Sequence, residues 1–287
     1  MAEQNTSPRT TYEQRQHFNP LTTWLHSFRY RHIHRVFAHL SVEIGDRPIR
    51  VIDIGCGYAK LFTVLNDRFR IEYTGIERNE ERVGVARERH GHHENFRVVH
   101  DSATEALAHV PPNHADIVVA LETFEHIPEH DVVRIVERIA ELRPRRLVCS
   151  VPVEIGPAIW LKNVGSFLTG YVRHRDYSWR ETFWAGLYCL DKLPPHGTRH
   201  KGFDWRWLAQ TVRHNFGIRA IHRLPLRVLP SALSTNVFFV AEPRAVPDRH
   251  DARPDGDNQM IASTPAESIG SRASSREGAD RRQETLA

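Results

Sequence analysis

The sequence has few cysteines and no long apolar run, and both absences limit what the protein can be. Its three cysteines, Cys56, Cys149 and Cys189, lie far apart and fit no zinc-binding spacing. A sparse, odd set argues against a disulfide framework, so we expect a reducing, cytoplasmic environment. The chain has no stretch of about 18 uninterrupted apolar residues, and its N-terminus lacks the apolar core of a signal peptide. We therefore expect no transmembrane segment, which leaves peripheral membrane contact open.

The rest of the composition is ordinary for a folded protein. The 287 residues are 40% hydrophobic and 26% charged, which suits one α/β domain with additions. The net charge is only +4, and arginine is scattered along the chain. This pattern favours a solvated surface over a nucleic-acid-binding face. Both ends are polar and aperiodic, so we expect residues 1–18 and 243–287 to be disordered.

Between these ends, short apolar runs alternate with helical stretches. Five runs have the length and the β-branched residues of strands, at 49–54, 71–77, 96–100, 115–121 and 146–151. They are continuously apolar, which is typical of a parallel sheet that helices cover on both faces. Two more strands are expected at 217–224 and 235–241. We therefore predict a doubly wound, Rossmann-like α/β fold with a mainly parallel seven-stranded sheet.

Two additions flank this pattern. Residues 19–47 carry apolar side chains at helical spacing, as at Leu21, Trp24 and Leu25, and we expect a helical cap of one or two helices there. After the fifth strand, residues 157–203 form an aromatic-rich insert, which we expect to be helical. Either addition could cover a ligand site, although packing against the core is the commoner role of such segments.

Small and acidic residues follow successive strands of the predicted sheet. In the order of the strands that they follow, they are Asp53, Gly55, Gly57, Glu77, Asp101, Ser102 and Glu122. In an open parallel sheet, ligands bind beyond the carboxyl ends of the strands, near the switch in strand order. We therefore expect these residues to meet at one edge of the sheet and to bind a common ligand.

The residue types indicate which ligand this is. Glycines let the backbone turn tightly and approach a ligand closely. An acidic residue about twenty positions later, at the end of the second strand, can accept hydrogen bonds from ribose hydroxyls. A nicotinamide dinucleotide would require a third glycine, but Lys60 stands at that position, and Asp53 would lie poorly beside a pyrophosphate. The Tyr-x-x-x-Lys pair of short-chain oxidoreductases is not found near the fifth strand.

Together these segments resemble the ordered motif series of class I S-adenosylmethionine-dependent methyltransferases, over roughly residues 48–242. The matching segments are Val51-Ile-Asp-Ile-Gly-Cys-Gly57, Tyr73-Thr-Gly-Ile-Glu77, His100-Asp-Ser-Ala103 and Ala115-Asp-Ile-Val-Val-Ala-Leu-Glu122. The resemblance implies that the first motif holds the methionine portion, where Asp53 suits its ammonium group. It places the ribose at Glu77 and the adenine at Asp101 with Ser102. It also implies an antiparallel last strand, which residues 235–241 would supply.

The residues that would face the methyl acceptor have several possible roles. In Glu122-Thr-Phe-Glu125-His126, helical spacing would place the two carboxylates and the imidazole on one face. His126 could then act as a general base that the carboxylates orient, or Glu122, Glu125 and His126 could bind Mg²⁺ or Mn²⁺. A third interpretation is that the histidine packs against the sheet edge and orients a loop, as in many metal-free class I enzymes.

The E-x-x-E-H pattern resembles both the metal-dependent small-RNA 3′-end 2′-O-methyltransferases and the ubiquinone-biosynthesis O-methyltransferases. In the former, a further histidine precedes a Phe-acid-Trp segment; His200 matches it here, with one extra residue before Phe203. We expect the insert at 157–203 to be the acceptor lid. We predict O-methylation of a small or a lipid- or sugar-linked metabolite. The alternatives are a metal-dependent RNA 2′-O-methyltransferase and a catalytically silent cofactor-binding partner subunit.

Overall fold

The structure is a computed structural model that describes residues 20–160, 163–164, 178–193, 202–224, 234 and 236–244. The side chains that it describes begin at Phe28. Contacts divide the chain into two units, residues 1–245 and 246–287, and every described residue lies in the first. The predicted disorder at residues 1–18 and at 245–287 falls outside the described part and stays a prediction, whereas Pro243, where the predicted tail begins, is the last residue of β7.

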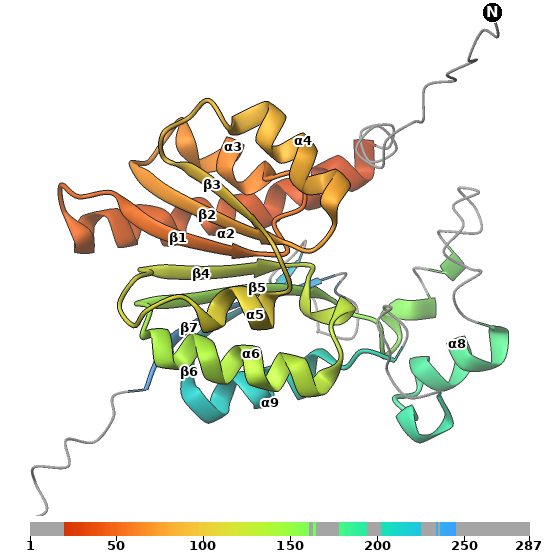
Figure 1. The fold of residues 1–287 in the computed structure, drawn as a ribbon. Coiled ribbons are helices and arrows are strands. Elements are labelled where there is room, and N and C mark those ends of the chain that lie inside the picture. The colour runs from red at the N-terminus through yellow and green to blue at the C-terminus, as the bar shows by residue number, and fades with distance from the viewer. Residues whose placement is uncertain are drawn as a thin grey trace, which may run out of the picture. The chain divides into compact units, whose positions relative to one another are not determined.

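A seven-stranded sheet forms the centre of the first unit (Figure 1). Its order is β3-β2-β1-β4-β5-β7-β6, so the strand order switches between β1 and β4. The first five strands are parallel, and β7 runs antiparallel to both β5 and β6. This confirms the predicted doubly wound fold with an antiparallel last strand. The strands are β1 (Ile49–Ile54), β2 (Ile71–Glu77), β3 (Phe96–His100), β4 (Ile117–Leu121), β5 (Arg146–Pro152), β6 (Phe216–Leu224) and β7 (Asn236–Pro243).

Helices cover both faces of the sheet (Figure 1). One face packs against α2 (Pro20–Ile44), α3 (Lys60–Asn66) and α4 (Glu80–His90). The other packs against α5 (Ala103–Ala108), α6 (Glu129–Leu142) and α9 (Trp205–Asn215). The remaining described elements are the 3₁₀ turns η1 (Phe124–His126) and η3 (Leu190–Lys192) and the helix α8 (Trp179–Gly186).

Apolar spacing explains how these helices pack. In α6, the buried residues recur every three or four positions, at Val132, Ile135, Val136, Ile139 and Leu142. In α2, Ile33, Phe37 and Leu40 are buried at the same spacing and pack across the sheet, in one cluster with residues of β1, β4, β5 and β7. The N-terminal segment is therefore a single helix that runs to Ile44, where the sequence left one or two helices open.

Two predicted element boundaries move for local reasons. The helix expected from Tyr58 begins at Lys60, because Gly57 and Ala59 both have positive φ angles, 57° each, that a right-handed helix cannot include. The fourth strand, expected from Ala115, begins at Ile117. There the side chain of Asp116 accepts a hydrogen bond of 2.9 Å from the main-chain amide of Arg50.

Candidate cofactor and acceptor site

The loop after β1 is shaped by contact with the loop after β4. Gly55 has a φ of +69°, and a Cβ atom on it would lie 2.5 Å from Cγ2 of Thr123. The Thr123 hydroxyl donates to the carbonyl oxygens of Ile54, at 3.0 Å, and Leu121, at 3.1 Å. Gly57 also has a positive φ of +57°, but a Cβ atom there would meet nothing within 4 Å. Gly55 thus serves packing, whereas Gly57 leaves open space above the backbone into which a ligand could fit.

Glu77 at the end of β2 holds this loop in place. Its Oε2 accepts a hydrogen bond of 2.9 Å from the amide of Gly57, and its Oε1 accepts one of 2.9 Å from the amide of Asn79. The side chain is buried. A carboxylate offers about four acceptor positions, so both oxygens can still accept hydrogen bonds from a ligand. The structure therefore places a fixed acidic group beside the open side of Gly57.

Asp53 is the last residue but one of β1 and lies on the face of the sheet that α2 and α3 cover. It is 3% exposed, and the Tyr73 hydroxyl donates to its Oδ2 at 2.6 Å. Burial raises the pKa of Asp53 to about 7, although the hydrogen bond from Tyr73 opposes this and the charge of Glu77 adds to it. A cation near this carboxyl would favour its ionised form.

Asp101 and Ser102 follow β3 and lie next to Glu77. The amide of Asp101 donates to the carbonyl of Glu77 at 3.2 Å, and the Asp101 side chain accepts from the amide of Ser102 at 2.7 Å. The Ser102 hydroxyl accepts a hydrogen bond of 3.2 Å from the amide of Glu105 and so caps α5. Asp101 is therefore the better placed of the two to contact a ligand at this edge.

Glu122, directly after β4, has an unusual backbone conformation, and its side chain has several hydrogen-bond and ion-pair partners. Its φ is +53°, which is uncommon for a residue other than glycine and recurs at functional sites. Its Oε1 accepts from the Ser150 hydroxyl at 3.2 Å and from the Asn236 amide at 2.7 Å, and pairs with a guanidinium nitrogen of Arg29 at 3.3 Å. Elements distant in the sequence therefore converge on one carboxylate.

Arg29, Ser150 and Asn236 were not identified from the sequence. Ser150 carried a signal, because a hydroxyl at the end of an apolar strand marks the carboxyl edge, where it lies opposite Leu121. Asn236, opposite Pro152, carried a weaker signal of the same kind. Arg29 carried none, because a charged residue on a predicted helix does not reveal against which strand that helix packs.

The structure separates the two neighbouring residues Glu125 and His126, whereas Glu122 lies close enough to Glu125 for their charges to interact. Glu125 is fully buried, whereas His126 is exposed. Glu125 and His126 are adjacent in the 3₁₀ turn η1, which has about three residues per turn, so these two side chains point in different directions. Burial raises the pKa of Glu125 well above its usual range, and the charges of Glu122 and then Glu154 add to this.

This arrangement does not fit a divalent cation. Among the residues that the structure describes, no group of three or more His, Cys, Asp or Glu side chains could hold a metal ion. The proposed fourth ligand, His200, lies outside the described residues. The metal hypothesis for Glu122, Glu125 and His126 therefore gains no support from the geometry.

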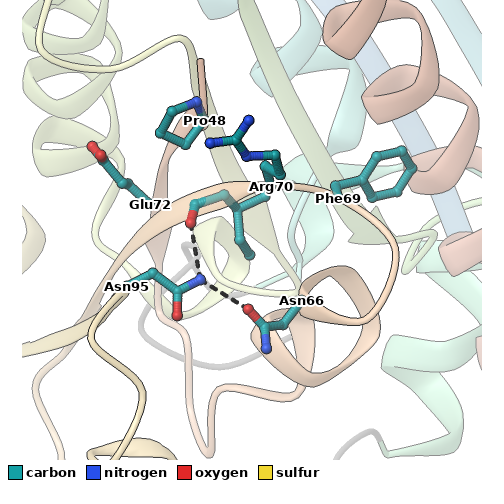
Figure 2. Close-up of a pocket in the computed structure, with 7 residues that line it drawn as sticks. Pro48, Asn66, Phe69, Arg70, Glu72 and Asn95 are labelled. Atoms are coloured by element: carbon teal, nitrogen blue, oxygen red, sulfur yellow. Dashed lines mark hydrogen bonds between the residues drawn. The ribbon is translucent and has the colours of Figure 1, made fainter. Parts of the chain in front are cut away.

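A cavity of about 360 Å³ lies at the opposite end of the strands (Figure 2). Pro48, which precedes β1, and Ile71, which begins β2, are among its lining residues. Asn95 bridges its floor, donating to the side chain of Asn66 at 2.8 Å and to the carbonyl of Ile71 at 2.9 Å. Because ligands of open α/β sheets bind at the carboxyl ends, this cavity is not the candidate site.

Known structures share this fold. The methyltransferase domain of bacterial CtHen1-CN superposes with a TM-score of 0.51 at 15% identity, covering 76% of this chain and 99% of that one. WbdD in complex with a kinase inhibitor has a TM-score of 0.50 at 17% identity and 75% coverage, and the chain spans 40% of the WbdD chain. Magnesium protoporphyrin IX methyltransferase from Synechocystis PCC 6803 with bound SAM has a TM-score of 0.46 at 16% identity, covering 78% and 84%.

A family model describes the segment that carries the motifs. Residues 51–144 match the model of a methyltransferase domain, and no curated protein matches the sequence significantly. The matched segment runs from the third residue of β1 to the connection before β5, so it includes the glycine loop, Glu77, Asp101 and Glu122. The segment of residues 51–144 is therefore similar to a methyltransferase domain, and the fold around it is one that solved methyltransferase structures share. No described helix is long and apolar enough to cross a membrane.

Proposed function

We propose that the protein transfers the methyl group of S-adenosylmethionine to an oxygen atom of a small or a lipid- or sugar-linked metabolite. The main support is that three features lie at one edge of the sheet. They are the open glycine loop, the carboxylate of Glu77, which the amides of Gly57 and Asn79 hold in place, and the start of the aromatic insert. The insert joins this edge through the amide of Gly156, which donates to the carbonyl of Ala185 at 2.8 Å. The insert therefore starts at the same edge of the sheet as the glycine loop, because both follow parallel strands.

This geometry supports a role for each proposed cofactor residue. Gly57 would let the backbone approach the methionine portion, Gly55 would shape the same loop by packing against Thr123, and Asp53 would attract the ammonium group. Glu77 would accept hydrogen bonds from the ribose hydroxyls, and Asp101, with Ser102 behind it as a helix cap, would face the adenine. When bound, S-adenosylmethionine supplies a methyl group on a sulfonium, which an aligned acceptor displaces in line.

On the acceptor side, we assign the base to His126. It is the exposed member of η1 and stands at the carboxyl end of β4, where its imidazole can take a proton from an acceptor hydroxyl. Glu125, buried behind the same turn, would position the segment rather than touch the acceptor. Glu122 would keep Arg29 and Asn236 in place beside it.

The acceptor class can be tested directly. Purified protein is incubated with methyl-labelled cofactor and with separate lipid, small-molecule and RNA fractions, each before and after exhaustive chelation. We expect label in the lipid or small-molecule fraction and no loss of label on chelation. Label in RNA that disappears on chelation would support the metal-dependent RNA enzyme instead. Cofactor binding without any transfer would support the silent partner subunit.

The role of His126 can be tested on whichever acceptor is found. We expect His126→Ala to lower kcat about a hundredfold, as loss of a general base does, with unchanged affinity for S-adenosylhomocysteine. His130→Ala is the matched control, because this side chain is 70% exposed and lies four residues further, in the first turn of α6. An activity that is equal in the two variants would show that His126 is not the base.

The raised pKa of Asp53 predicts a pH dependence of binding and of stability. Its folded value of about 7 lies above the ordinary 3.8, so ionisation destabilises the folded protein as pH rises through that range. We expect Asp53→Asn to raise the melting temperature above pH 7 and to weaken S-adenosylmethionine binding about tenfold.

Wild-type affinity for the cofactor should rise between about pH 6 and 8, because the ionised carboxylate attracts the ammonium group. Calorimetry and thermal melts over this range measure both effects. The control is Asp67→Asn, at an exposed carboxyl just after α3. A pH dependence that persists in Asp53→Asn would show that another group titrates.

A further inference from the structure

The helix α8 has a defined inner side. Its small residues Thr182, Ala185 and Gly186 are buried, and a Cβ atom on Gly186 would collide with the ring of Trp160. The indole nitrogen of Trp160 donates to the carbonyl of Thr182 at 3.0 Å. Ser178 and Glu181 form a capping box that fixes the start of the helix. The orientation of α8 is therefore set by close packing on one side.

Trp184 packs inward against Ile159 and Leu193, whereas three other apolar side chains of α8 and its C-cap are exposed. Trp179, Phe183 and Leu187 follow one another at intervals of four residues and so form a single stripe, which we call the α8 stripe. They are 79%, 52% and 45% exposed. Among the described residues, every exposed large hydrophobic side chain except Val42 lies in the insert; the others are Trp160, Val164 and Tyr188. A grouping of this kind marks an interaction surface rather than ordinary surface composition.

The insert also carries the charge excess of the protein. Residues 157–203 contain seven Lys and Arg against three Asp and Glu. This excess of four equals that of the whole chain, which has 39 basic and 35 acidic residues, so the remainder is balanced. Arg180 lies exposed beside Trp179, and Lys192 lies exposed in η3. The apolar stripe is thus accompanied by basic side chains.

We propose that the insert docks on the surface of an anionic lipid bilayer, with the α8 stripe in the headgroup region. Amphipathic helices that lie on membranes combine Trp, Phe and Leu on one side with Lys and Arg nearby, and aromatic side chains favour the membrane–water interface. RNA is the less suitable partner, because Leu187 and Val164 offer no ring on which a base could stack. Figure 1 shows α8 beyond the carboxyl ends of β4 and β5, so docking would bring the acceptor edge to the membrane.

Vesicle flotation with the full-length protein tests this proposal. One set of vesicles contains phosphatidylcholine and phosphatidylglycerol in a ratio of roughly two to one, and the other contains phosphatidylcholine alone. We expect binding to the anionic vesicles that weakens in high salt. The double variant W179S/F183S should reduce the partition coefficient at least about tenfold, and R180Q about fivefold on anionic vesicles only.

The matched control is V42S, which removes an apolar side chain that is 84% exposed on α2 and leaves the insert unchanged. Thermal melts of all variants check that the fold is intact. Binding of the wild type to neither vesicle overturns the proposal, as does equal binding by W179S/F183S and V42S.

A parallel titration with single-stranded RNA tests the alternative partner. Stripe-dependent binding to RNA, with no stripe-dependent binding to vesicles, would assign the surface to nucleic acid. Because none of these measurements involves transfer, they stand apart from the acceptor test above.

Discussion

Replacement of Glu77 by alanine is expected to weaken binding of S-adenosylhomocysteine about a thousandfold. Two hydrogen bonds between ribose hydroxyls and a carboxylate contribute about 4 kcal/mol together. The same carboxylate also accepts hydrogen bonds from the amides of Gly57 and Asn79, so its loss would free the glycine loop in addition to removing the proposed ribose contact. Calorimetry with S-adenosylhomocysteine measures this effect without turnover.

The control for this variant is Glu72→Gln, at an exposed position on the same strand. Glu72 lies at the other end of β2, beside the cavity of Figure 2, and we expect wild-type affinity there. Thermal melts separate weakened binding from unfolding. If Glu77→Ala binds within about threefold of the wild type, the proposed cofactor site is wrong, whatever the acceptor.

The second large effect concerns stability. Asp116 is 3% exposed and accepts two hydrogen bonds of 2.7 Å from the guanidinium of Arg47. Arg50 adds side-chain bonds of 3.1 and 3.2 Å and a main-chain bond of 2.9 Å. We expect Asp116→Ala to lower the free energy of unfolding by about 3 kcal/mol. This is the lower end for a broken buried pair, because the two arginines are 42% and 33% exposed.

Urea denaturation measures this loss, and Asp191→Ala serves as the control. Asp191 is 71% exposed and pairs with Lys192 at 3.3 Å, so its removal should change stability by less than about 0.5 kcal/mol. A loss below about 1 kcal/mol for Asp116→Ala would show that this network contributes little.

The same network predicts sensitivity to acid. Burial alone would raise the pKa of Asp116, but the hydrogen bonds from Arg47 and Arg50 outweigh it and hold the pKa well below its usual range. The folded protein therefore binds this proton more weakly than the unfolded chain does. The stabilisation is complete above the ordinary value near 3.8 and is lost as pH falls below it. Asp116→Ala should accordingly show a flatter loss of stability in acid.

The fold could be predicted because its signals are local. Each strand is a short apolar run and each covering helix has an apolar stripe, so their order could be read along the chain. The acids at strand ends were predictable for the same reason, since the parallel topology alone brings carboxyl ends to one edge. The family match to residues 51–144 supports the same methyltransferase interpretation.

The acceptor side could not be predicted in the same way. Arg29 reaches Glu122 only because α2 packs across the sheet, and Asn236 reaches it only because β7 pairs with β5. Spacing suggested that Glu125 and His126 act together, but the 3₁₀ turn buries one and exposes the other. These are consequences of packing between segments far apart in the chain, which periodicity does not encode.

The alternation of short apolar runs with helical stretches was enough to predict a parallel α/β sheet, and the glycines and acids that follow its strands were enough to propose a ligand site at one edge. The amino-acid order could do this because strand formation and turn geometry depend on neighbouring residues. Only the tertiary structure decided that Glu77 accepts a hydrogen bond from the amide of Gly57, that Asp53 is buried against Tyr73, and that the α8 stripe is exposed. Each of these depends on which surfaces exclude water from one another, and that is settled only when the whole chain has packed.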